Sequence, residues 1–378
     1  MSASATASSA TQPLRGLSTP CLLLDEARLT RNLSRMRARL DGLGVRLRPH
    51  LKTAKCWEVA RLAMPSPAGP ATVSTLREAE VFAGHGVRDI LYGVGIAPAK
   101  LDRVGAIRRE TGADLAVLLD SLAQAQAVAA WSRASGDPLP ALIELDSDGH
   151  RSGVAPGDRD RLAAIGRALV EGGATLRGVL THAGDSYGLS DPEALAAAAE
   201  AERAAGLPCP VVSVGSTPTA THARDLAGVT EVRAGVYMFG DLVQAGIGAC
   251  AVDDIAVSVL ATVIGHQRAR GWIIVDAGWM ALSRDRGTAR QAVDQGYGLV
   301  CDAGGRPYPD LIVADANQEH GILALRPRAG GVPPDLPLGT LVRILPNHAC
   351  ATGAQYDAYH VLDGAGAVTA VWPRIRGW

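Results

Sequence analysis

The 378-residue chain has few aromatic residues and no long apolar run. Aromatic residues make up 4% of it and Phe occurs twice, so the core has to be built from Ala, Val, Leu and Ile. No stretch of about 18 apolar residues occurs, which excludes an ordinary membrane-spanning helix. Residues 1–17 lack the basic and apolar segments of a secretion signal. We therefore expect a frayed N-terminal tail and a cytoplasmic protein.

An excess of one charge is also absent, because 37 basic residues balance 38 acidic ones and no Lys/Arg run occurs. This balance argues against a nucleic-acid-binding surface and against docking on a membrane. The widely spaced cysteines form no CxxC pair, and this pattern favours free thiols over disulfides. Apolar residues make up 47% of the chain, which is enough for a sizeable core in about two domains.

Residues 26–240 repeat one rhythm, in which a short apolar segment is followed by a loop and a helical segment. Eight strands are predicted, and each is apolar throughout, as strands covered on both faces are. Eight such units in about 215 residues favour a (β/α)8 TIM barrel over an open doubly wound sheet. The predicted strands are 45–52, 71–75, 89–94, 114–120, 140–146, 175–182, 211–216 and 231–234, and the predicted helices are 55–64, 76–85, 98–111, 121–134, 156–172, 192–205 and 218–226.

From about residue 251 the rhythm changes to short β-like segments separated by loops rich in Gly and Pro, which predicts a second, mainly β domain. The early segment 19–24 has no place in the barrel and is expected to join that domain. The predicted division is a tail at 1–17, a barrel at 26–250, and a β domain made of 18–25 and 251–378. The predicted strands of the β domain are 255–264, 271–275, 311–314, 340–345, 359–362 and 368–372.

Lys52 lies at the end of the first predicted barrel strand, in the segment RPHLK. Reactive groups of (β/α)8 barrels cluster at the C-terminal ends of the strands. A water-poor barrel mouth disfavours the charged form of a lysine, which makes Lys52 a candidate Schiff-base nucleophile. An ordinary surface lysine is the alternative interpretation.

The seventh and eighth strands each end in a glycine turn. Gly215, Ser216 and Thr217 open a helix, where backbone N–H groups and hydroxyls favour an anion. A plain helix cap explains the same Ser/Thr-Pro pattern. The eighth strand ends in Arg233, Ala234 and Gly235, with Tyr237 nearby, and the two turns lie at the usual phosphate position of this fold.

Strands five and six bring further polar residues to the same end of the barrel. Arg151 follows the fifth strand, and His182 and Tyr187 follow the sixth. His182 is equally compatible with a hydrogen-bonded core histidine, and Asp148 and Asp185 with loop caps.

His348 and Cys350 follow an apolar strand of the predicted β domain, in PNHACATG. Alternation along an extended chain places both on one face, and imidazole with thiolate suits Zn²⁺. Two ligands leave positions open for water or substrate, as Lewis-acid catalysis requires. A buried cysteine beside a polar histidine is the alternative.

The ordered set of motifs along the chain resembles the metal-activated D-serine dehydratase/D-threonine aldolase family, which shares the barrel of alanine racemase (fold type III). The resemblance runs from about Thr19 to the C-terminus. Its motifs are RPHLKTAK, TVSTLREAE, DSDGHRSG, THAGDSY, VSVGSTPT, EVRAGVY, DAGWMALSRD, QEHG and PNHACATG.

The resemblance implies that Lys52 carries pyridoxal 5′-phosphate (PLP) covalently and that His348 and Cys350 bind a divalent metal, commonly zinc, with Mn²⁺ or Mg²⁺ as alternatives. Arg151 matches the residue that reaches the phenolate side of PLP, and His182 matches the histidine stacked on its ring. The other implied roles are contacts to the phosphate by Gly215, Ser216, Thr217, Gly235 and Tyr237, a place facing the pyridine nitrogen for Arg233, and a place in the substrate pocket for Tyr187.

The chain departs from the family pattern at two positions. Asp185 stands where relatives have a second histidine in HAGHSY, and Ala54 stands where many have histidine. The role of each of these histidines is therefore in doubt here. At the metal, the His-x-Cys form is dehydratase-like, whereas the aldolase branch tends towards His-x-Asp.

These matches imply a lyase acting on a small D-3-hydroxy amino acid. We expect β-elimination of the D-serine dehydratase type, giving a 2-oxo acid and ammonia. The alternatives are retro-aldol cleavage to glycine and an aldehyde, racemisation with Tyr356 or Tyr359 as second base, and non-catalytic PLP binding. By the same resemblance the protein is expected to be a homodimer.

Overall fold

The computed structural model describes residues 13–147, 149, 151–182, 206–327 and 329–378. Its contacts divide the chain into two compact units. The barrel unit consists of Ser34–Gly235 with Ile375–Trp378, and the β unit consists of the chain through Leu33 with Val236–Arg374. None of the helices in the described ranges is long and apolar enough to cross a membrane.

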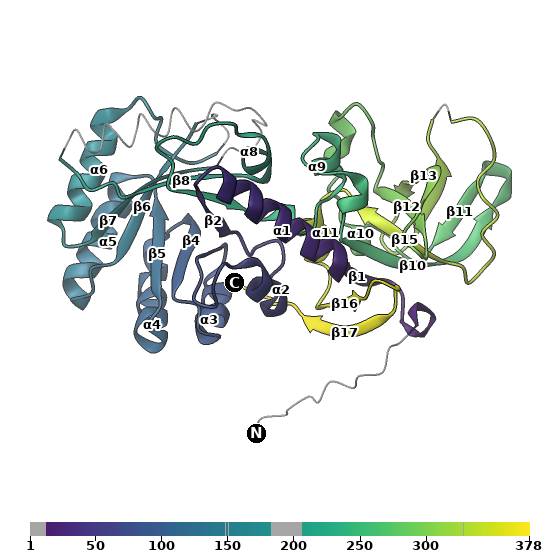
Figure 1. Cartoon of the computed structure of the whole chain (residues 1–378), viewed down its shortest axis with the longest axis horizontal. Helices are drawn as coiled ribbons and strands as arrows, with labels where there is room; N and C mark the ends of the chain where they lie inside the picture. Colours follow the sequence, from purple (N-terminus) through teal and green to yellow (C-terminus); the bar gives the residue numbers. More distant parts are fainter. Residues whose placement is uncertain (1–12, 148, 150, 183–205, 328) are drawn as a thin grey trace, which may run out of the picture. The chain divides into compact units, whose positions relative to one another are not determined.

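The barrel unit contains an eight-stranded parallel sheet in the order β2-β9-β8-β7-β6-β5-β4-β3. A parallel bridge between His50 and Thr72 joins the first strand to the last, which closes the barrel. In Figure 1 these strands lie inside a layer of helices. The strands are β2 (Arg46–Pro49), β3 (Ala71–Val73), β4 (Asp89–Gly95), β5 (Asp114–Leu119), β6 (Pro140–Leu145), β7 (Thr175–Thr181), β8 (Val211–Gly215) and β9 (Glu231–Ala234).

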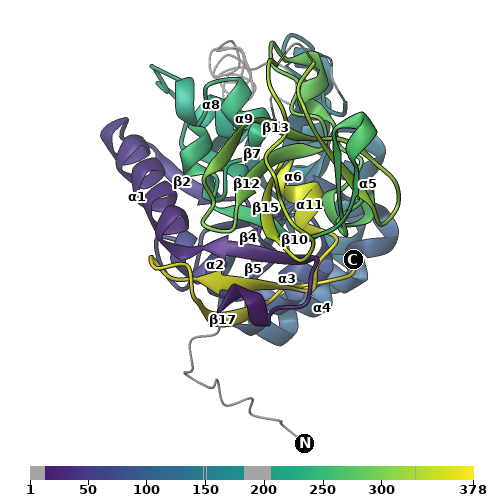
Figure 2. The same cartoon turned by 90° about the vertical axis from the view of Figure 1, so that its right-hand side faces the viewer.

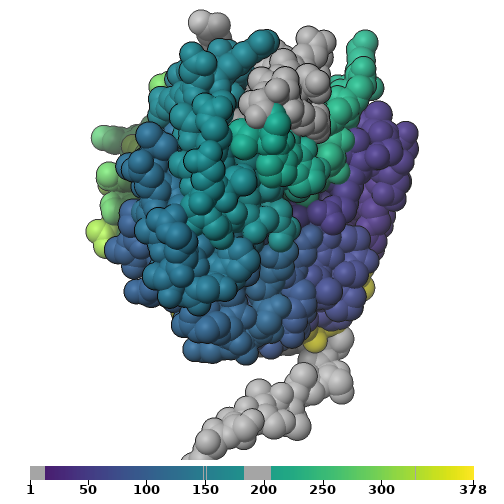
Figure 3. Space-filling model, turned by 90° about the vertical axis from the view of Figure 1, so that its left-hand side faces the viewer, coloured from purple at the N-terminus to yellow at the C-terminus, as the bar shows by residue number. Residues whose placement is uncertain are grey.

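Helices connect these strands on the outside of the barrel, and the view in Figure 3 shows segments between about residues 50 and 180 forming its outer surface in blue and teal. Polar caps fix the ends of several of them. Thr75 and Glu78 form a reciprocal capping box at α3, and Gly112 ends α4 in the left-handed conformation at φ 71°. These helices are α2 (Trp57–Ala63), α3 (Leu76–Gly84), α4 (Leu101–Thr111), α5 (Leu122–Ser135), α6 (Arg159–Glu171) and α8 (Thr217–His222). Helix α1 (Glu26–Gly42) precedes the first barrel strand, β2.

The β unit is built on a nine-stranded sheet, part of which faces the viewer in Figure 2. The predicted segment 19–24 contributes strand β1 of this sheet, which begins at Cys21, ends at Asp25, and lies antiparallel to β10 and parallel to β16. The strands are β1 (Cys21–Asp25), β10 (Val257–Gln267), β11 (Trp272–Val275), β12 (Gly298–Asp302), β13 (Pro307–Ala316), β14 (Gly321–Leu325), β15 (Leu341–Pro346), β16 (Ala358–Leu362) and β17 (Val368–Pro373), and the short helices are α9 (Leu242–Gly246), α10 (Trp279–Leu282) and α11 (Ala349–Gly353).

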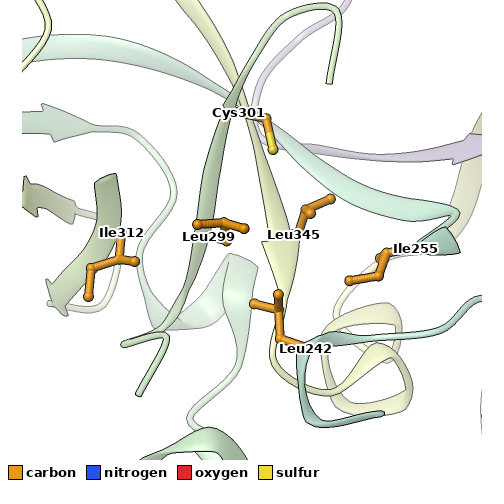
Figure 4. Close-up of a cluster of buried hydrophobic side chains, with 6 residues drawn as sticks. All are labelled: Leu242, Ile255, Leu299, Cys301, Ile312 and Leu345. Carbon is orange, nitrogen blue, oxygen red and sulfur yellow. The ribbon is translucent and has the colours of Figure 1, made fainter. Parts of the chain in front are cut away.

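The core of the β unit uses aliphatic side chains, as the scarcity of aromatic residues predicts. One cluster of buried side chains joins residues from β12, β13 and β15 to residues at α9 and before β10 (Figure 4). Its members are Leu242, Ile255, Leu299, Cys301, Ile312 and Leu345.

The predicted fold class, a TIM barrel with a mainly β domain, is confirmed, and all eight predicted barrel strands are present. Helix α2 begins at Trp57 rather than residue 55, because Lys55 has a φ of 45° and cannot join the helix. Helix α8 ends at His222, earlier than predicted, because Ala223 turns away from helical backbone angles. Helix α1 and strands β12 and β14 were not predicted, and the predicted helix 192–205 lies outside the described residues.

Candidate active site

Lys52 lies in the turn that follows β2, at the C-terminal end of a barrel strand, as predicted. Two residues earlier, His50 is buried beside it. The backbone N–H of Lys52 faces His50 Nδ1 at 3.5 Å. His50 was not singled out from the sequence, although it stands in the same segment RPHLK.

The electrostatics of His50 show which basic groups converge on this end of the barrel. Burial drives the pKa of His50 well below its ordinary value, and electrostatic repulsion from the basic groups of Lys52, Arg233, His182 and Arg151 lowers it further. His50 is therefore neutral at pH 7. The structure thus brings together four of the predicted site residues, from the ends of β2, β6, β7 and β9.

Arg151 is held by a carboxylate on β6. Its Nη2 donates to Glu144 Oε1 at 3.1 Å, and Ser152 Oγ donates to Glu144 Oε2 at 2.9 Å. Burial raises the pKa of Glu144, while Arg151 and Ser152 act in the opposite direction. An otherwise costly buried carboxylate is thereby stabilised by the residues that it positions.

Arg233 points into the interior of the barrel and is fully enclosed. Its Nη1 donates to Ser213 Oγ at 2.6 Å, and its Nη2 donates to the carbonyl oxygen of Thr181 at 2.6 Å. Burial lowers the pKa of Arg233 to about 10, so the guanidinium keeps its charge at neutral pH.

The two glycine turns permit close approach of neighbouring strands. A Cβ on Gly215 would lie 2.8 Å from the carbonyl oxygen of Arg233, and one on Gly235 would lie 2.9 Å from the carbonyl oxygen of His50. Ser216 caps α8 by accepting the backbone N–H of Thr219 at 3.1 Å. Thr217, the first residue of α8, is buried.

The predicted metal pair lies in the β unit, where His348 precedes α11 and Cys350 lies within it. His348 Nδ1 is 2.6 Å from Asp285 Oδ2. Burial lowers the pKa of His348, but hydrogen bonds to Asp285 and Cys350 outweigh burial and raise it. Since Nδ1 is engaged by a carboxylate, Nε2 is the nitrogen left for a metal.

A second carboxylate supports the backbone between the two predicted ligands. Asp241 is buried, and its Oδ2 accepts the backbone N–H of Ala349 at 3.0 Å while its Oδ1 accepts that of Gln244 at 2.9 Å. Burial raises the pKa of Asp241 to about 6. Among the described residues, no group of three or more His, Cys, Asp or Glu side chains forms a metal site.

The remaining predicted site residues are two tyrosines. Tyr237 is buried in the turn Val236–Met238, which belongs to the β unit. Tyr187 and Asp185 lie outside the described residues.

Family models match both parts of the chain. Residues 24–243 match the alanine racemase N-terminal domain, and residues 256–362 match a serine dehydratase domain. The chain belongs to the alanine racemase-like family of PLP-dependent enzymes. Within this family it falls among the D-serine dehydratase and D-threonine aldolase lyases, as the motifs predicted.

Several relatives of this family member align over nearly its whole length. It is 56% identical to D-threo-3-hydroxyaspartate dehydratase of a Delftia species, over 96% of this chain and 98% of that protein. It is 27% identical to D-serine dehydratase of Dictyostelium discoideum, over 97% and 98% of the two chains. A solved structure of the Delftia dehydratase matches with a TM-score of 0.92, over 97% of this chain and 100% of that chain.

The structure adds supporting residues that the sequence reasoning missed, namely His50, Glu144, Ser213, Glu231, Asp241 and Asp285. For some of them a signal was present. Ser213 precedes Gly215 by two residues and Glu231 precedes Arg233 by two, so each pair shares one face of its strand. Because alternate residues of a strand share a face, Ser213 and Glu231 are predicted to lie on the same side of the barrel wall as Gly215 and Arg233.

Proposed function

We propose that this lyase eliminates water from D-3-hydroxy amino acids and that its preferred substrate is D-threo-3-hydroxyaspartate, giving oxaloacetate and ammonia. The His348–Cys350 pair chiefly supports the elimination, and the 56% identity to D-threo-3-hydroxyaspartate dehydratase supports the choice of substrate. Two solved structures of D-threo-3-hydroxyaspartate dehydratase carry a histidine-to-alanine change and, two positions further on, a cysteine-to-alanine change in a metal-free form. The same residue types at the same spacing lie at positions 348 and 350 of this chain.

The barrel unit fits PLP. Lys52, Arg151, His182 and Arg233 all act on the buried His50, so the end of the barrel collects positive charge suited to an anionic aldehyde cofactor. Glycines at 215 and 235 allow backbone to come close, which suits a phosphate contact. Lys52 would hold the aldehyde, and the other barrel residues predicted above would surround the ring and the phosphate.

When bound, PLP supplies an electron sink that makes the Cα–H bond of an amino acid acidic. The Nζ of Lys52 takes the Cα proton, because the amine that would hold the cofactor is also the base closest to the bond between cofactor and substrate. Glu144 keeps Arg151 in place through an ion pair. His50, two residues before Lys52, is neutral and therefore does not compete with Lys52 as a proton donor.

The β unit fits a divalent metal through its donor chemistry. His348 Nε2 and the Cys350 thiolate are ligands that suit Zn²⁺, and Asp285 orients the imidazole through Nδ1. A metal held there supplies Lewis acidity, which makes the β-hydroxyl a better leaving group.

The structure disfavours a racemase. The hydroxyl of Tyr356 donates to the carbonyl oxygen of Ala281 at 3.0 Å, and that of Tyr359 accepts from Arg374 Nε at 3.0 Å. Burial raises the pKa of Tyr356, which makes it a poor second base.

Products from three substrates test the assignment. Purified enzyme is incubated with D-threo-3-hydroxyaspartate, D-serine and D-threonine, and 2-oxo acid, ammonia, glycine and aldehyde are quantified. We expect oxaloacetate and ammonia from the first substrate with the highest kcat/KM, and slower 2-oxo acid release from D-serine. Glycine with glyoxylate from the first substrate, or glycine with acetaldehyde from D-threonine, would instead establish an aldolase. Light scattering of the same preparation tests the homodimer that the family resemblance implies.

A further inference from the structure

Buried polar side chains form a continuous line through the barrel on β2, β8 and β9. Arg233 Nη1 donates to Ser213 Oγ at 2.6 Å, and Ser213 Oγ donates to Glu231 Oε1 at 2.8 Å. Glu231 also accepts from Arg48 Nε, at 2.9 Å to Oε1 and 2.8 Å to Oε2. The exposed fractions of these four residues are 4%, 0%, 2% and 6% for Arg233, Ser213, Glu231 and Arg48.

The direction of each bond follows from what the groups can do. A guanidinium can only donate, and an ionised carboxylate can only accept. The hydroxyl of Ser213 therefore gives its proton to Glu231 and accepts from Arg233 with a lone pair. Ser213 thus links a buried cation on β9 to a buried anion on the same strand, and its own rotamer is fixed by both.

Arg233 and Arg151 are held in different ways. Arg151 makes a direct ion pair with Glu144. Glu231, by contrast, is engaged by the guanidinium groups of Arg48 and Arg46, the latter at 2.9 Å. The hydrogen bonds of Arg233 go to the neutral oxygens of Ser213 and Thr181, so its charge is less fully compensated by contact than that of Arg151.

We propose that Ser213 and Glu231 are positioning residues. They hold the Arg233 side chain in the orientation and the charge state in which it contacts bound PLP. This inference rests on the proposed function, because it requires PLP in the barrel. Ser213 and Glu231 act only through Arg233. Glu231 supplies the negative charge that favours the buried guanidinium of Arg233. Ser213, hydrogen-bonded to both side chains, fixes the orientation of that guanidinium.

The test is the variant Ser213→Ala, measured by PLP binding to the apoenzyme and by the absorbance of bound PLP as a function of pH. Loss of a hydrogen bond to a buried charge should weaken PLP binding by about 10-fold. The midpoint of the absorbance titration should move by about one pH unit, since Arg233 is then held less firmly. A purely structural serine would lower stability without moving that midpoint.

The chain offers a matched control in the β unit. Ser258 on β10 is 0% exposed and its Oγ accepts from Nε of the buried Arg343 at 3.0 Å. Ser258→Ala should lower thermal stability but leave the PLP affinity and the titration midpoint of the wild type unchanged. Ser213→Cys keeps nearly the same volume with a weaker donor, so it should shift both quantities in the same direction as Ser213→Ala even if the alanine variant does not fold.

A double-mutant cycle with Arg233→Lys tests the pathway of the effect. If Ser213 acts through Arg233, adding Ser213→Ala to Arg233→Lys should cause little further loss of PLP affinity. Wild-type PLP affinity and titration in both Ser213 variants, or full additivity in the cycle, would overturn the inference alone. Failure of the wild-type apoenzyme to bind PLP would instead overturn the proposed function.

Discussion

Lys52 is one of three lysines in the chain, and the other two have identifiable partners. Lys55 Nζ lies 3.9 Å from Glu78 Oε2, and Lys100 Nζ donates to the hydroxyl of Tyr92 at 3.2 Å. The end of β2 places Lys52 beside the buried His50. The proposed role of the Lys52 amine can therefore be tested with Lys55, three residues further on, as the control.

Lys52→Ala should abolish the covalent lysine–PLP bond and lower activity by about 100-fold or more, because both the attachment site and the proposed base are lost. Borohydride reduction followed by peptide mass spectrometry checks this directly. Lys55→Ala should keep the modified peptide at Lys52. A PLP adduct that persists on another lysine in the Lys52→Ala protein would show that the assignment of Lys52 is incorrect.

Asp285 is the residue that most directly supports the proposed metal ligands. Its short contact to His348 Nδ1 fixes the ring, and loss of such a partner typically costs 10–100-fold in metal affinity. We expect Asp285→Ala to weaken Zn²⁺ binding to metal-free protein by about 10-fold or more, measured by competition with a chelating dye. Asp285→Asn should recover part of it, since an amide oxygen also accepts from Nδ1.

Asp294 provides the control for this experiment. It pairs with Arg286 Nη2 at 2.7 Å on a partly exposed surface, so Asp294→Asn should leave metal affinity unchanged. Equal metal affinity of wild type and Asp285→Ala would show that Asp285 does not support the metal site.

At the scale of elements, the barrel could be predicted because its strands are apolar throughout and recur with helices between them. Helix α1 escaped prediction because it is rich in charge and precedes the first barrel strand. Strands β12 and β14 are five residues each and lie among glycine-rich turns, where the apolar segments are too short to stand out. Pairing with distant strands, rather than local pattern, makes them strands.

The supporting residues of the site were harder to predict for a related reason. Asp285 contacts His348 across 63 positions of sequence, and in isolation it looks like a loop cap. The motifs identified Lys52, His348 and Cys350 because reactive residue types stand out by their chemistry. The carboxylates that hold these residues have no such signal until the fold brings the partners together.

Strands β2 and β9 are joined by a buried ion pair that makes barrel stability depend on pH. Burial raises the pKa of Glu231, but Arg48, Arg46 and Ser213 outweigh burial and lower it below its ordinary value. A lowered pKa means that the stabilisation is present above the pKa of the unfolded state and is lost as pH falls through the folded value. The ion pair therefore contributes fully at pH 7 and fades in acid.

Glu231→Gln should destabilise the protein at pH 7 by about 1–3 kcal/mol, because it removes the buried charge partner of Arg48 and leaves only Asp89, 2.7 Å from Arg48 Nη1, to pair with it. Urea unfolding at a series of pH values checks this prediction. The difference in the free energy of unfolding between wild type and Glu231→Gln should become smaller below about pH 4.5. Glu80→Gln is the control. It removes a partly exposed partner of Arg103 and should cost at most about 1 kcal/mol. A gap for Glu231→Gln that stays constant into acid would contradict this account of the ion pair.

At the scale of the whole molecule, the two units carry different parts of the proposed chemistry. The barrel unit holds Lys52, the proposed base for the Cα proton. The β unit holds His348 and Cys350, the proposed support for the departing hydroxyl. This division predicts that the two steps can be separated by removing the metal alone.

Metal-free enzyme prepared with a chelator should still exchange the Cα proton of a D-3-hydroxy amino acid with deuterium, because Lys52 is untouched. It should release ammonia at least about 100-fold more slowly, since hydroxide is then a poor leaving group without Lewis-acid assistance. Proton NMR in deuterated buffer measures the exchange, and an ammonia assay measures the elimination. Added Zn²⁺ should restore elimination in wild type but not in Cys350→Ala. Undiminished ammonia release from the metal-free protein would show that the barrel unit performs the whole reaction and that the His-x-Cys pair serves another purpose.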